Sequence, residues 1–437
     1  MSPSLRPLIN FIHGHAELNI LVHSMQKSEA SYWLVGGCLR NSLLNLPQVD
    51  IDIACSYDPT PLVRDWSSQV SGHWFWLDSE RRQSRVILTS GLALDFAPLR
   101  STSISNDLRL RDFTVNALAL PVDELYPNSP LLDPLNGINH LNDRQLFCCS
   151  EQSFIDDPLR MLKGVRHAVT LNFELAVETL RLIAASQELL KCSAGERIRD
   201  EFAKIFNSEN VVGGVQLLFT SGLLAVLFGP AGEDWDFHSA LSKIDELRDK
   251  IDAGRSAQVE SLSVTTKQGS FSLRGLLIFS LLIKLYQPEN LPELLHGRLR
   301  LSRRDKALII ALQAALDLET LSLLETITGK RREALLAESL GPFYFERVLL
   351  WGVYPALISL DRLIEIQRSF DHEQVSGVVP ALLNGRQIAA FLAPQRGVKI
   401  GEWLGKIKLA EIKGEISSVL EAEKWLKSKL IFDKKEA

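Results

Sequence analysis

The pattern of apolar and polar residues divides the chain into a mixed first quarter and a helical remainder. Short apolar runs in the first quarter predict β-strands. We expect these strands at residues 32–35, 49–54, 73–77, 84–88 and 93–97. A helix is expected between them at residues 61–70, and residues 1–28 are expected to form a short helical lead-in.

After about Phe154 the apolar residues recur at the spacing of helices, and strand signals nearly disappear. Helices are expected at residues 159–169, 176–190, 198–205, 211–219, 241–251, 276–285, 307–316 and 345–368. Residues 123–142 are rich in Pro, Asn, Asp and Gly, which predicts a connector, and residues 254–268 predict an exposed loop. The fold class expected from the pattern is therefore α+β, with a mixed first domain followed by an all-helical region.

Composition and charge restrict the class of protein. The chain has 437 residues, enough for several domains, and its five cysteines lack the spacing of a zinc site. The longest apolar stretch, Leu276 to Leu285, is too short to span a bilayer and contains Lys284. With no secretion signal at the N-terminus, these features indicate a cytoplasmic protein without a membrane segment.

The net charge of −5 does not by itself indicate a nucleic-acid-binding protein. Residues 380–437 nevertheless contain 11 Lys and Arg against 7 Asp and Glu, a local balance of +4. This basic end of the chain is either a surface that contacts a nucleic-acid backbone or the solvated face of a helix.

The most informative short motif is Val49-Asp50-Ile51-Asp52-Ile53. Side chains alternate between the two faces of a strand, so both carboxylates lie on one face and the three apolar residues lie on the other. Two neighbouring carboxylates repel each other, and a divalent cation between them would relieve that repulsion. Oxygen ligands of this kind suit Mg²⁺. The alternative is an edge strand with a solvated acidic face.

A glycine pair precedes this motif by about a dozen residues. Gly36 and Gly37 follow a predicted strand and lead into Arg40 at the start of a helix. Such a turn lets phosphate oxygens approach backbone N–H groups. Gly36, Gly37 and Arg40 are therefore candidate nucleotide-binding residues. A phosphate site beside metal-binding carboxylates predicts nucleotidyl transfer.

Further motifs follow in a characteristic order along residues 32–206, with a weaker match near the C-terminus. They read RDFTVNAL from Arg111, LDPLNG from Leu132, DDPLRMLKGVR from Asp156 and ERIRDEF from Glu196. Together with the Gly36-Gly37 and Asp50/Asp52 motifs, they resemble the class II tRNA nucleotidyltransferases (CCA-adding enzymes), a family that includes bacterial poly(A) polymerases.

The resemblance implies a polymerase-β-type head followed by helical neck, body and tail domains. We expect a nucleotidyltransferase head at 1–145, a base-recognising neck at 146–210, a body at 211–375 and a tRNA-binding tail at 376–437. The implied substrates are CTP, ATP and the 3′ end of tRNA, with Mg²⁺ as cofactor. No membrane and no obligate protein partner is expected.

The resemblance also assigns the catalytic residues. Asp50 and Asp52 match the metal-binding carboxylates of the family. Asp95 lies where the family often has a third acidic residue on a neighbouring strand, where it would complete the metal site or act as a base. The competing interpretation of Asp95 is an ordinary acidic residue at the end of a strand.

The nucleotide-binding residues follow from the same comparison. Arg111, Asp112 and Asn116 match a motif that holds ribose and phosphates, although Asp112 and Asn116 could instead be buried capping residues. Asp157 and Arg160 match the protein template that selects the base, with an N-cap and an i,i+3 ion pair as the alternative. Lys163 and Arg166 are expected to support this site or to contact phosphates, while Glu196 and Arg197 brace the template helix.

The template predicts which bases are accepted. Cytosine and adenine each present an exocyclic amine beside a ring-nitrogen acceptor, which suits one carboxylate acceptor and one arginine donor. Guanine and uracil present the reverse pattern and would be rejected. A single protein site can therefore select C and A without a nucleic-acid template.

The chain departs from the family pattern at several positions. Asn41, Asp156 and Leu110 replace a usual Asp, Glu and Arg, respectively. The bridge from Arg100 to Asp107 contains only six residues, whereas full CCA-adding members carry a longer flexible loop there. The short bridge predicts an enzyme that adds C efficiently and the terminal A poorly or not at all. The alternative is that another segment supplies the movement and that the enzyme adds both CMP and AMP to build the full CCA end.

Three other functions stay open from the sequence. A poly(A) polymerase would share the motifs but usually has longer basic extensions. A non-catalytic RNA-binding protein could keep the fold, although both Asp50 and Asp52 are retained here. A small-molecule nucleotidyltransferase would need neither the Asp157/Arg160 template nor a long helical arm.

Overall fold

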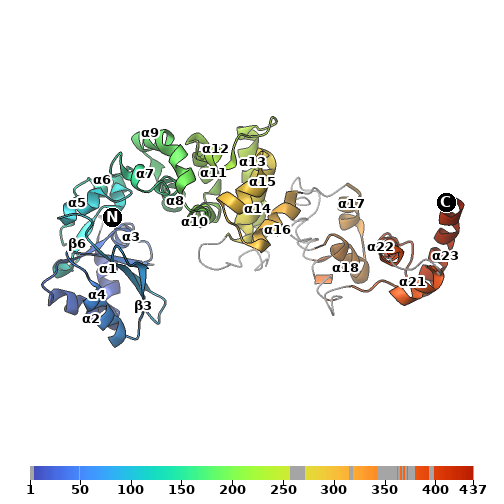
Figure 1. The fold of residues 1–437 in the computed structure, drawn as a ribbon, viewed down its shortest axis with the longest axis horizontal. Helices are drawn as coiled ribbons and strands as arrows, with labels where there is room; N and C mark the ends of the chain where they lie inside the picture. The colour runs from blue at the N-terminus through green and yellow to red at the C-terminus, as the bar shows by residue number, and fades with distance from the viewer. Residues whose placement is uncertain are drawn as a thin grey trace. The chain divides into compact units, whose positions relative to one another are not determined.

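The computed structural model describes residues 4–48, 50–255, 271–313, 318–341, 362, 365–366, 368–369, 372, 379–392 and 398–436. The chain forms two compact units (Figure 1). The first contains Met1–Pro230 and Glu289–Arg300, and the second contains Ala231–Pro288 and Leu301–Ala437. The four domains expected from the sequence are a finer division than these units, and their boundaries stay predictions.

The first unit begins with a six-stranded mixed sheet. Its strands are β1 (Tyr32–Val35), β2 (Asp50–Cys55), β3 (His73–Asp78), β4 (Gln83–Ile87), β5 (Ala93–Pro98) and β6 (Ala119–Pro121). Their order in the sheet is β3-β4-β5-β2-β1-β6, and β2 and β5 run parallel. All five strands expected from the sequence are present. The additional β6 has only three residues, too few for a periodic pattern.

Helices cover the apolar face of this sheet (Figure 1). They are α1 (Arg6–His13), α2 (Ala16–Gln26), α3 (Gly37–Leu43) and α4 (Thr60–Gln69). α3 contacts β1 and β2, α4 contacts β3, and α1 and α2 pack against α3 and α4. The buried Trp66 ring of α4 meets Phe96 of β5 edge-on, 6.1 Å between centroids, and Trp66 Nε1 donates to the Glu17 carbonyl. This helical layer leaves the opposite face of the sheet for polar residues.

One row of register partners crosses that opposite face. Asp52 of β2 pairs with Val35 of β1 on one side and with Asp95 of β5 on the other. Asp95 pairs in turn with Arg85 of β4, and Arg85 pairs with Phe75 of β3. Register partners point to the same face of a sheet. The row therefore places two carboxylates, a guanidinium and an aromatic ring side by side.

A helical segment follows the sheet within the first unit. Its main elements are α5 (Ile104–Arg109), η1 (Thr114–Asn116), η2 (Val122–Glu124), α6 (Gly137–Asn142), α7 (Ser153–Asp156), α8 (Arg160–Leu171), α9 (Val177–Ser186), η3 (Gln187–Cys192), α10 (Gly195–Phe206), α11 (Val211–Thr220), α12 (Leu223–Phe228), α15 (Leu291–Glu293) and η5 (Leu294–Arg298). α8 packs against α10 and α11. The short strands β7 (Gln145–Leu146) and β8 (Glu174–Leu175) pair in parallel, so one strand does occur in the region that the pattern predicted to be helical.

The described part of the second unit is helical. It contains α13 (Phe237–Arg255), α14 (Leu273–Tyr286), α16 (Arg303–Gln313), α17 (Leu318–Thr326), α18 (Lys330–Ser339), α21 (Gly385–Leu392), α22 (Val398–Ile412) and α23 (Val419–Glu436). Most of the expected helix at 345–368 and almost all of the expected loop at 254–268 lie outside the described residues; residues 362, 365, 366 and 368, which are described, are helical. Among the helices that are described, none has the length and hydropathy needed to cross a membrane.

The last three helices share a small hydrophobic core. Trp403 and Ile407 of α22 are buried in it together with Ile388 of α21 and Leu426 of α23. Ion pairs fasten α22 to α18, Arg331 Nε to Glu411 Oε1 at 2.5 Å and Lys408 Nζ to Glu338 Oε2 at 2.9 Å. The C-terminal helices therefore form an ordered module within the second unit.

Candidate active site

The carboxylates predicted from the sequence lie together on the polar face of the sheet. Asp50 is exposed at the start of β2, Asp52 is half-buried, and Asp95 is the register partner of Asp52 on β5. Burial, followed by the charge of Asp50, raises the pKa of Asp52 to about 6, with Asp95 adding to the effect and Arg111 and Arg85 opposing it. The protein therefore holds Asp52 at an electrostatic cost, which a bound cation would relieve.

Asp95 has a partner that the sequence did not predict. Arg85 binds it through two parallel hydrogen bonds, Nε to Oδ1 at 2.6 Å and Nη2 to Oδ2 at 2.7 Å. Throughout the part of the chain that the structure describes, no group of three or more His, Cys, Asp or Glu is arranged to hold a metal ion. Asp50 and Asp52 supply oxygen donors that suit Mg²⁺, and a third ligand role for Asp95 stays a prediction.

The glycine turn lies directly beside these carboxylates. Gly36 has φ 75° and ψ −135°, a conformation that residues with a side chain rarely adopt. A Cβ atom at Gly36 would lie 3.0 Å from Asp52 Oδ2 and 3.4 Å from Arg111 Nη1. Gly36 is therefore required both for the turn and for the close approach of Asp52 and Arg111, and Gly37 begins α3 immediately after it.

Arg40 supports the site through hydrogen bonds to two asparagines. Its guanidinium donates to Asn116 Oδ1 at 2.6 Å and to Asn41 Oδ1 at 2.9 Å. It is buried, and burial above all, together with the nearby Arg166, lowers its pKa to about 10. Asn41, which departs from the family pattern, is thus an uncharged partner of Arg40. Arg40 does not line the cavity described below, and its predicted contact with nucleotide stays untested.

Asp112 and Asn116 belong to the same network. Asn116 Nδ2 donates to Asp112 Oδ1 at 3.2 Å, and the Phe113 backbone N–H donates to that oxygen at 2.8 Å. Burial alone would raise the pKa of Asp112, but Lys163, these hydrogen bonds and Arg160 outweigh it and lower the pKa. Asp112 is therefore an ionised acceptor at neutral pH. Both of these bonds end on Oδ1 of Asp112. Its Oδ2 can still accept from a nucleotide, so the capping contact and the predicted nucleotide contact are compatible.

The predicted template residues Asp157 and Arg160 both line the cavity but do not pair with each other. Asp157 Oδ2 accepts a hydrogen bond from Arg197 Nη2 at 3.0 Å. Arg160 Nη1 donates to Ser153 Oγ at 2.8 Å and Arg160 Nη2 to the Leu110 carbonyl at 3.0 Å, with longer bonds from Nη1 to the Ser153 and Arg111 carbonyls. The alternative of an i,i+3 ion pair is therefore wrong in this structure, while Arg197 braces the template as expected.

The two basic residues farther along α8 differ in their positions. Lys163 lines the cavity. Arg166 points instead to α10, where its Nε donates to Glu201 Oε2 at 2.7 Å. The buried Glu201 also pairs with Lys204. Arg166 therefore connects two helices. Of the two roles expected from the sequence, support of the site and contact with phosphates, this position fits the first.

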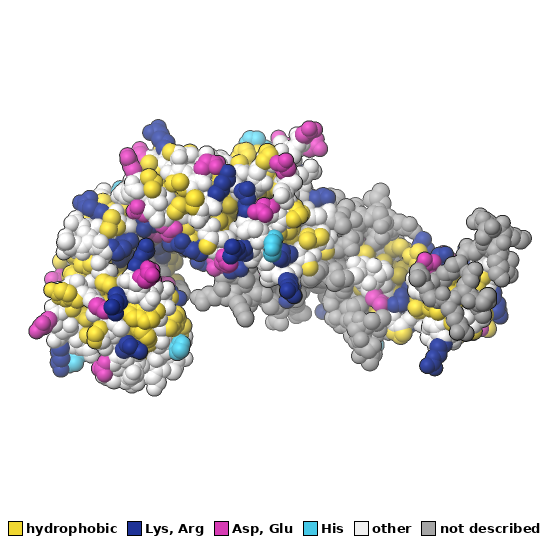
Figure 2. All heavy atoms as spheres, viewed as in Figure 1, with side chains coloured by type: hydrophobic (Ala, Val, Ile, Leu, Met, Phe, Trp, Pro, Cys, Tyr) yellow, Lys and Arg dark blue, Asp and Glu magenta, His cyan; other side chains and the backbone are white. Residues whose placement is uncertain are grey.

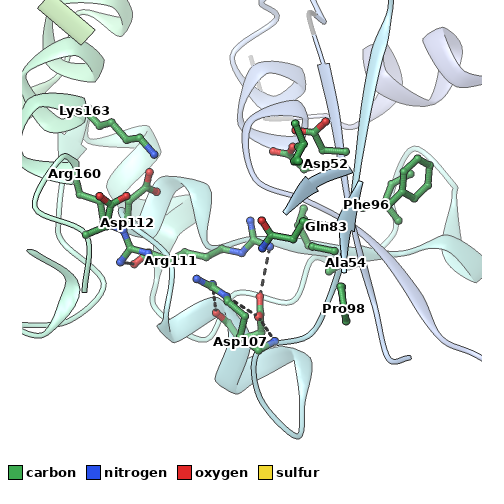
Figure 3. A pocket seen from close by; sticks show the side chains of 17 residues that line it. Asp52, Ala54, Gln83, Phe96, Pro98, Asp107, Arg111, Asp112, Arg160 and Lys163 are labelled. Atoms are coloured by element: carbon green, nitrogen blue, oxygen red, sulfur yellow. Dashed lines mark hydrogen bonds and ion pairs between the residues drawn. The ribbon is translucent and has the colours of Figure 1, made fainter. Parts of the chain in front are cut away.

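These side chains surround a cavity of about 370 Å³ (Figure 3). Figure 3 shows Asp112, Arg160 and Lys163 on one side, Asp52 on the other, and Arg111 extending between them. Arg111 Nε is buried without a hydrogen-bond partner among the described residues. The cavity adjoins a second one of about 830 Å³, since Gln83, Pro98, Arg100, Asp157 and Arg160 line both. The arrangement offers donors for a polyphosphate near the carboxylates and a hydrogen-bonding edge for a base at α8.

Arg100 holds the two ends of the short bridge, residues 101–106, together. Its backbone N–H and Nε donate to Asp107 Oδ1 at 3.0 and 3.2 Å, and its Nη groups donate to the Asp107 and Leu110 carbonyls. Asp107 is buried and also binds Arg111 Nη2 at 3.4 Å. Within the bridge, Ser103 caps α5 by accepting from the Asn106 N–H. The bridge is therefore a fastened helical turn.

The sequence did not predict the contacts of three residues of the site. These are Arg85, which binds Asp95, and Arg100 and Asp107, which bind each other. Strand alternation through residues 83, 85 and 87 would have placed Arg85 on the carboxylate face, but the register that joins it to Asp95 has no sequence signal. Basic and acidic side chains are interspersed over the visible face of the first unit (Figure 2), so charge alone did not reveal the site.

Comparison with known proteins agrees with this geometry. Residues 32–147 match the model of the poly(A) polymerase head domain, and residues 172–235 match a model described as a probable RNA and SrmB-binding site of polymerase A. Residues 32–147 are therefore a head domain of the poly(A) polymerase family. The matched head contains the glycine turn, the Asp50/Asp52 motif and the Arg111–Asn116 motif.

Three similar proteins are named as CC-adding or A-adding tRNA nucleotidyltransferases. A CC-adding tRNA nucleotidyltransferase of Geobacter sulfurreducens is 38% identical over 242 residues, 55% of this chain and 54% of that protein. A CC-adding tRNA nucleotidyltransferase of Synechocystis is 27% identical over 404 residues, 89% of this chain and 91% of that protein. An A-adding tRNA nucleotidyltransferase of Deinococcus radiodurans is 38% identical but covers only 44% of this chain and 43% of its own length.

Solved structures extend the likeness of fold to nearly the whole chain. The Thermotoga maritima CCA-adding enzyme in complex with tRNA superposes with a TM-score of 0.67 at 21% identity, covering 98% of this chain and all of that one. A CCA-adding enzyme in complex with CTP gives 0.70 at 21% identity, covering 98% of both chains. The polymerase-type head and helical remainder expected from the sequence are confirmed.

Proposed function

We propose that this protein is a tRNA nucleotidyltransferase of the cytoplasm that adds CMP from CTP to the 3′ end of tRNA and stops before the terminal A. The observation that carries the proposal is the single cavity that brings Asp52 and Arg111 of the carboxylate side opposite Asp157, Arg160 and Lys163 of α8. Carboxylates for a metal, donors for a triphosphate and a base-reading pair are the parts that untemplated nucleotidyl transfer requires.

Asp50 and Asp52 would hold Mg²⁺. The raised pKa of Asp52 supports this, since a cation would relieve the repulsion between the two carboxylates. When bound, the ion would neutralise charge that develops on the triphosphate during transfer.

The reaction forms one bond and breaks another. The 3′ oxygen of the RNA attacks the α-phosphorus of CTP, and the bond from the α-phosphorus to the bridging oxygen breaks as pyrophosphate leaves. The hydroxyl proton passes to water in the same step. Arg111, with its unpaired buried Nε, is placed to donate to the triphosphate, and the Gly36 turn keeps the path to Asp52 open. These residues orient the reactants and stabilise the charge on the phosphates.

The template selects the base by hydrogen-bond pattern. The bonds of Arg160 to Ser153, Leu110 and Arg111 leave its Nε–H and one Nη2–H for a ligand. Asp157 keeps acceptor capacity beyond the one bond from Arg197 and a long bond from the Leu159 N–H. A donor and an acceptor on one edge suit cytosine and adenine and reject uracil and guanine.

The bridge after Arg100 supports selection of C over A. A pocket that accepts first a pyrimidine and then a purine must change shape between additions. The bonds from Arg100 to Asp107 and Leu110 hold the bridge to the same segment that carries Arg111 and supports Arg160. The names of the Geobacter and Synechocystis relatives agree with this interpretation.

The product decides between CC and CCA addition. We expect a tRNA transcript that lacks CCA to be extended by two C residues and to receive little or no A when CTP and ATP are both present. Sequencing of the 3′ ends after complete reaction, with transcripts ending before CCA, after C and after CC as separate substrates, measures this. Products that end uniformly in CCA would overturn the CC-adding assignment, and long A tails would favour poly(A) polymerase activity.

The C-terminal helices are proposed to contact the tRNA backbone. Trp403 and Trp425 pack edge to face in a cavity of about 280 Å³, with Lys406, Lys413 and Lys429 on its wall. Lys406 lies over the Trp403 ring at 4.3 Å. Lysines grouped around aromatic rings suit an RNA surface.

Removing these three lysines tests the tail contact. We expect the variant with Ala at 406, 413 and 429 to bind tRNA more weakly and to reduce the slope of log Kd against log salt by up to about 3, since each phosphate contact contributes about 1. Lys424→Ala, on the same helix as Lys429 but outside the cavity, serves as the control. Equal salt slopes for the triple variant and the unmodified protein would contradict the proposed contact.

A further inference from the structure

The row of register partners continues past the carboxylates to residues that the reaction described above does not use. After Asp52 and Asp95 come Arg85 of β4 and Phe75 of the edge strand β3, all on one face of the sheet. Adjacent strands lie about 5 Å apart. The carboxylates, the guanidinium and the aromatic ring therefore follow one another in steps comparable to the length of a ribose.

The far end of this row is accessible and partly apolar. The side chains of Arg85 and Asp95 are 35% and 24% exposed to solvent. Beside them, His73 and Phe75 pack with ring centroids 5.5 Å apart, and Leu77 and Ile87 are exposed on the same two strands. The His73 ring is exposed and the Phe75 ring is half-buried. A cation with carboxylates on one side and accessible rings on the other suits a nucleotide.

The incoming triphosphate does not account for Arg85. The glycine turn and Arg111 lie on the β1 and β2 side of the row, next to Asp52. Arg85 lies beyond Asp95 in the opposite direction, because the strand order is β4-β5-β2-β1. The two sides of the carboxylates therefore offer separate cationic sites, and the nucleotidyl-transfer reaction brings two phosphate-bearing reactants.

We propose that Arg85 binds the phosphate between the last two nucleotides of the acceptor RNA, with Phe75 packing against the terminal nucleotide. This proposal rests on the proposed nucleotidyl transfer. An arginine fork bonds a phosphate with the same two-point geometry that it uses with a carboxylate. The arriving phosphate takes over Arg85, and Asp95 becomes free to accept a hydrogen bond from the 3′-hydroxyl at the other end of the same nucleotide. Arg85 thereby links RNA binding to the release of Asp95.

A double-substitution cycle between protein and RNA tests the contact. One acceptor RNA carries the natural last phosphate and another carries a neutral methylphosphonate there. In the unmodified protein we expect the neutral RNA to lower kcat/KM about 10- to 50-fold, and Arg85→Ala to cause a similar loss with natural RNA. Because both changes remove one interaction, together they should cost little more than either alone. The KM for CTP should stay within a factor of about 3.

Controls separate this contact from a structural role. Arg64→Ala removes an arginine from the opposite face, where it lies over Trp74, and should leave the effect of the methylphosphonate unchanged. Arg85→Lys retains the charge but not the fork and should recover only part of the loss. Losses that multiply in the cycle, or a rise in the KM for CTP equal to that for RNA, would overturn the proposal.

The same pair of RNAs also separates this proposal from nucleotidyl transfer itself. Equilibrium Kd values without CTP report the Arg85 contact whether or not the protein adds a nucleotide. A cycle that is coupled in Kd but accompanied by no CMP addition would reject the catalytic assignment and retain the phosphate contact. An active enzyme whose cycle is additive in both Kd and kcat/KM would reject the contact alone.

Discussion

Replacing either Asp50 or Asp52 with Ala is expected to lower kcat for CMP addition by at least about 1,000-fold. Both carboxylates lie on the polar face of β2, and each would supply an oxygen ligand to Mg²⁺. Losing a ligand removes several kcal/mol of charge stabilisation from the transition state. Binding of tRNA should remain nearly unchanged, because neither residue belongs to the helical region. Full activity in either variant would refute the metal-site assignment.

Asp52→Asn should show the same loss of activity together with a gain in stability. The folded-state pKa of Asp52, about 6, lies above the ordinary value for Asp, so the folded protein disfavours its charged form. For an acid with a raised pKa, the penalty is absent below the unfolded pKa near 4, grows as the pH rises, and is complete above about pH 6. Without Mg²⁺ at pH 7.5, the Asn variant should be more stable by about 1–3 kcal/mol.

Urea denaturation of the metal-free protein at pH 7.5 and pH 4.5 measures this gain. The advantage of Asp52→Asn should be present at pH 7.5 and small at pH 4.5, where Asp52 is protonated in the folded protein. Asp65→Asn, an exposed acid on α4, is the matched control and should change stability little at either pH. A variant that is less stable than the unmodified protein at pH 7.5 would show that Asp52 is not held at an electrostatic cost.

Local periodicity was sufficient to predict the parts of the site that lie on one strand or one helix. Alternation along β2 placed Asp50 and Asp52 on the same face. Lys163, which the resemblance to the family pointed to, lines the cavity. The two-residue repeat of a strand and the turns of a helix are local properties. They need no knowledge of what packs against the element.

The partners of the site residues could not be predicted, because they come from distant segments. Arg85 meets Asp95 only through the register of β4 and β5, and Arg166 meets Glu201 across 35 residues. Arg160 bonds to the Leu110 carbonyl 50 residues away. That bond uses a backbone carbonyl, so it does not depend on which side chain stands at position 110.

Arg160→Ala is expected to relax the choice of nucleotide about 5- to 150-fold. The loss corresponds to the roughly 1–3 kcal/mol of discrimination that one bidentate base contact provides. The measured quantity is the ratio of kcat/KM for CTP to that for UTP with the same tRNA. The ratio should fall because the N–H groups of Arg160 no longer face the ring N–H of uracil, which is also a donor. The Kd for tRNA should stay nearly constant. An unchanged ratio would leave Arg160 with only its structural bonds.

The buried bonds of Arg160 make a conservative variant necessary. Arg160→Ala removes one donor from each of the Leu110, Arg111 and Ser153 carbonyls. These carbonyls keep a second donor in Arg100, the Ser153 hydroxyl and the Asp157 N–H, respectively. The loss is therefore about 0.5–1.5 kcal/mol for each bond removed. Arg160→Lys keeps the charge and can still donate to one or two of these carbonyls, but it lacks the planar fork. If Lys restores thermal stability and discrimination stays low, Arg160 reads the base. If discrimination returns together with stability, the selectivity arises from the shape of the cavity that Arg160 supports.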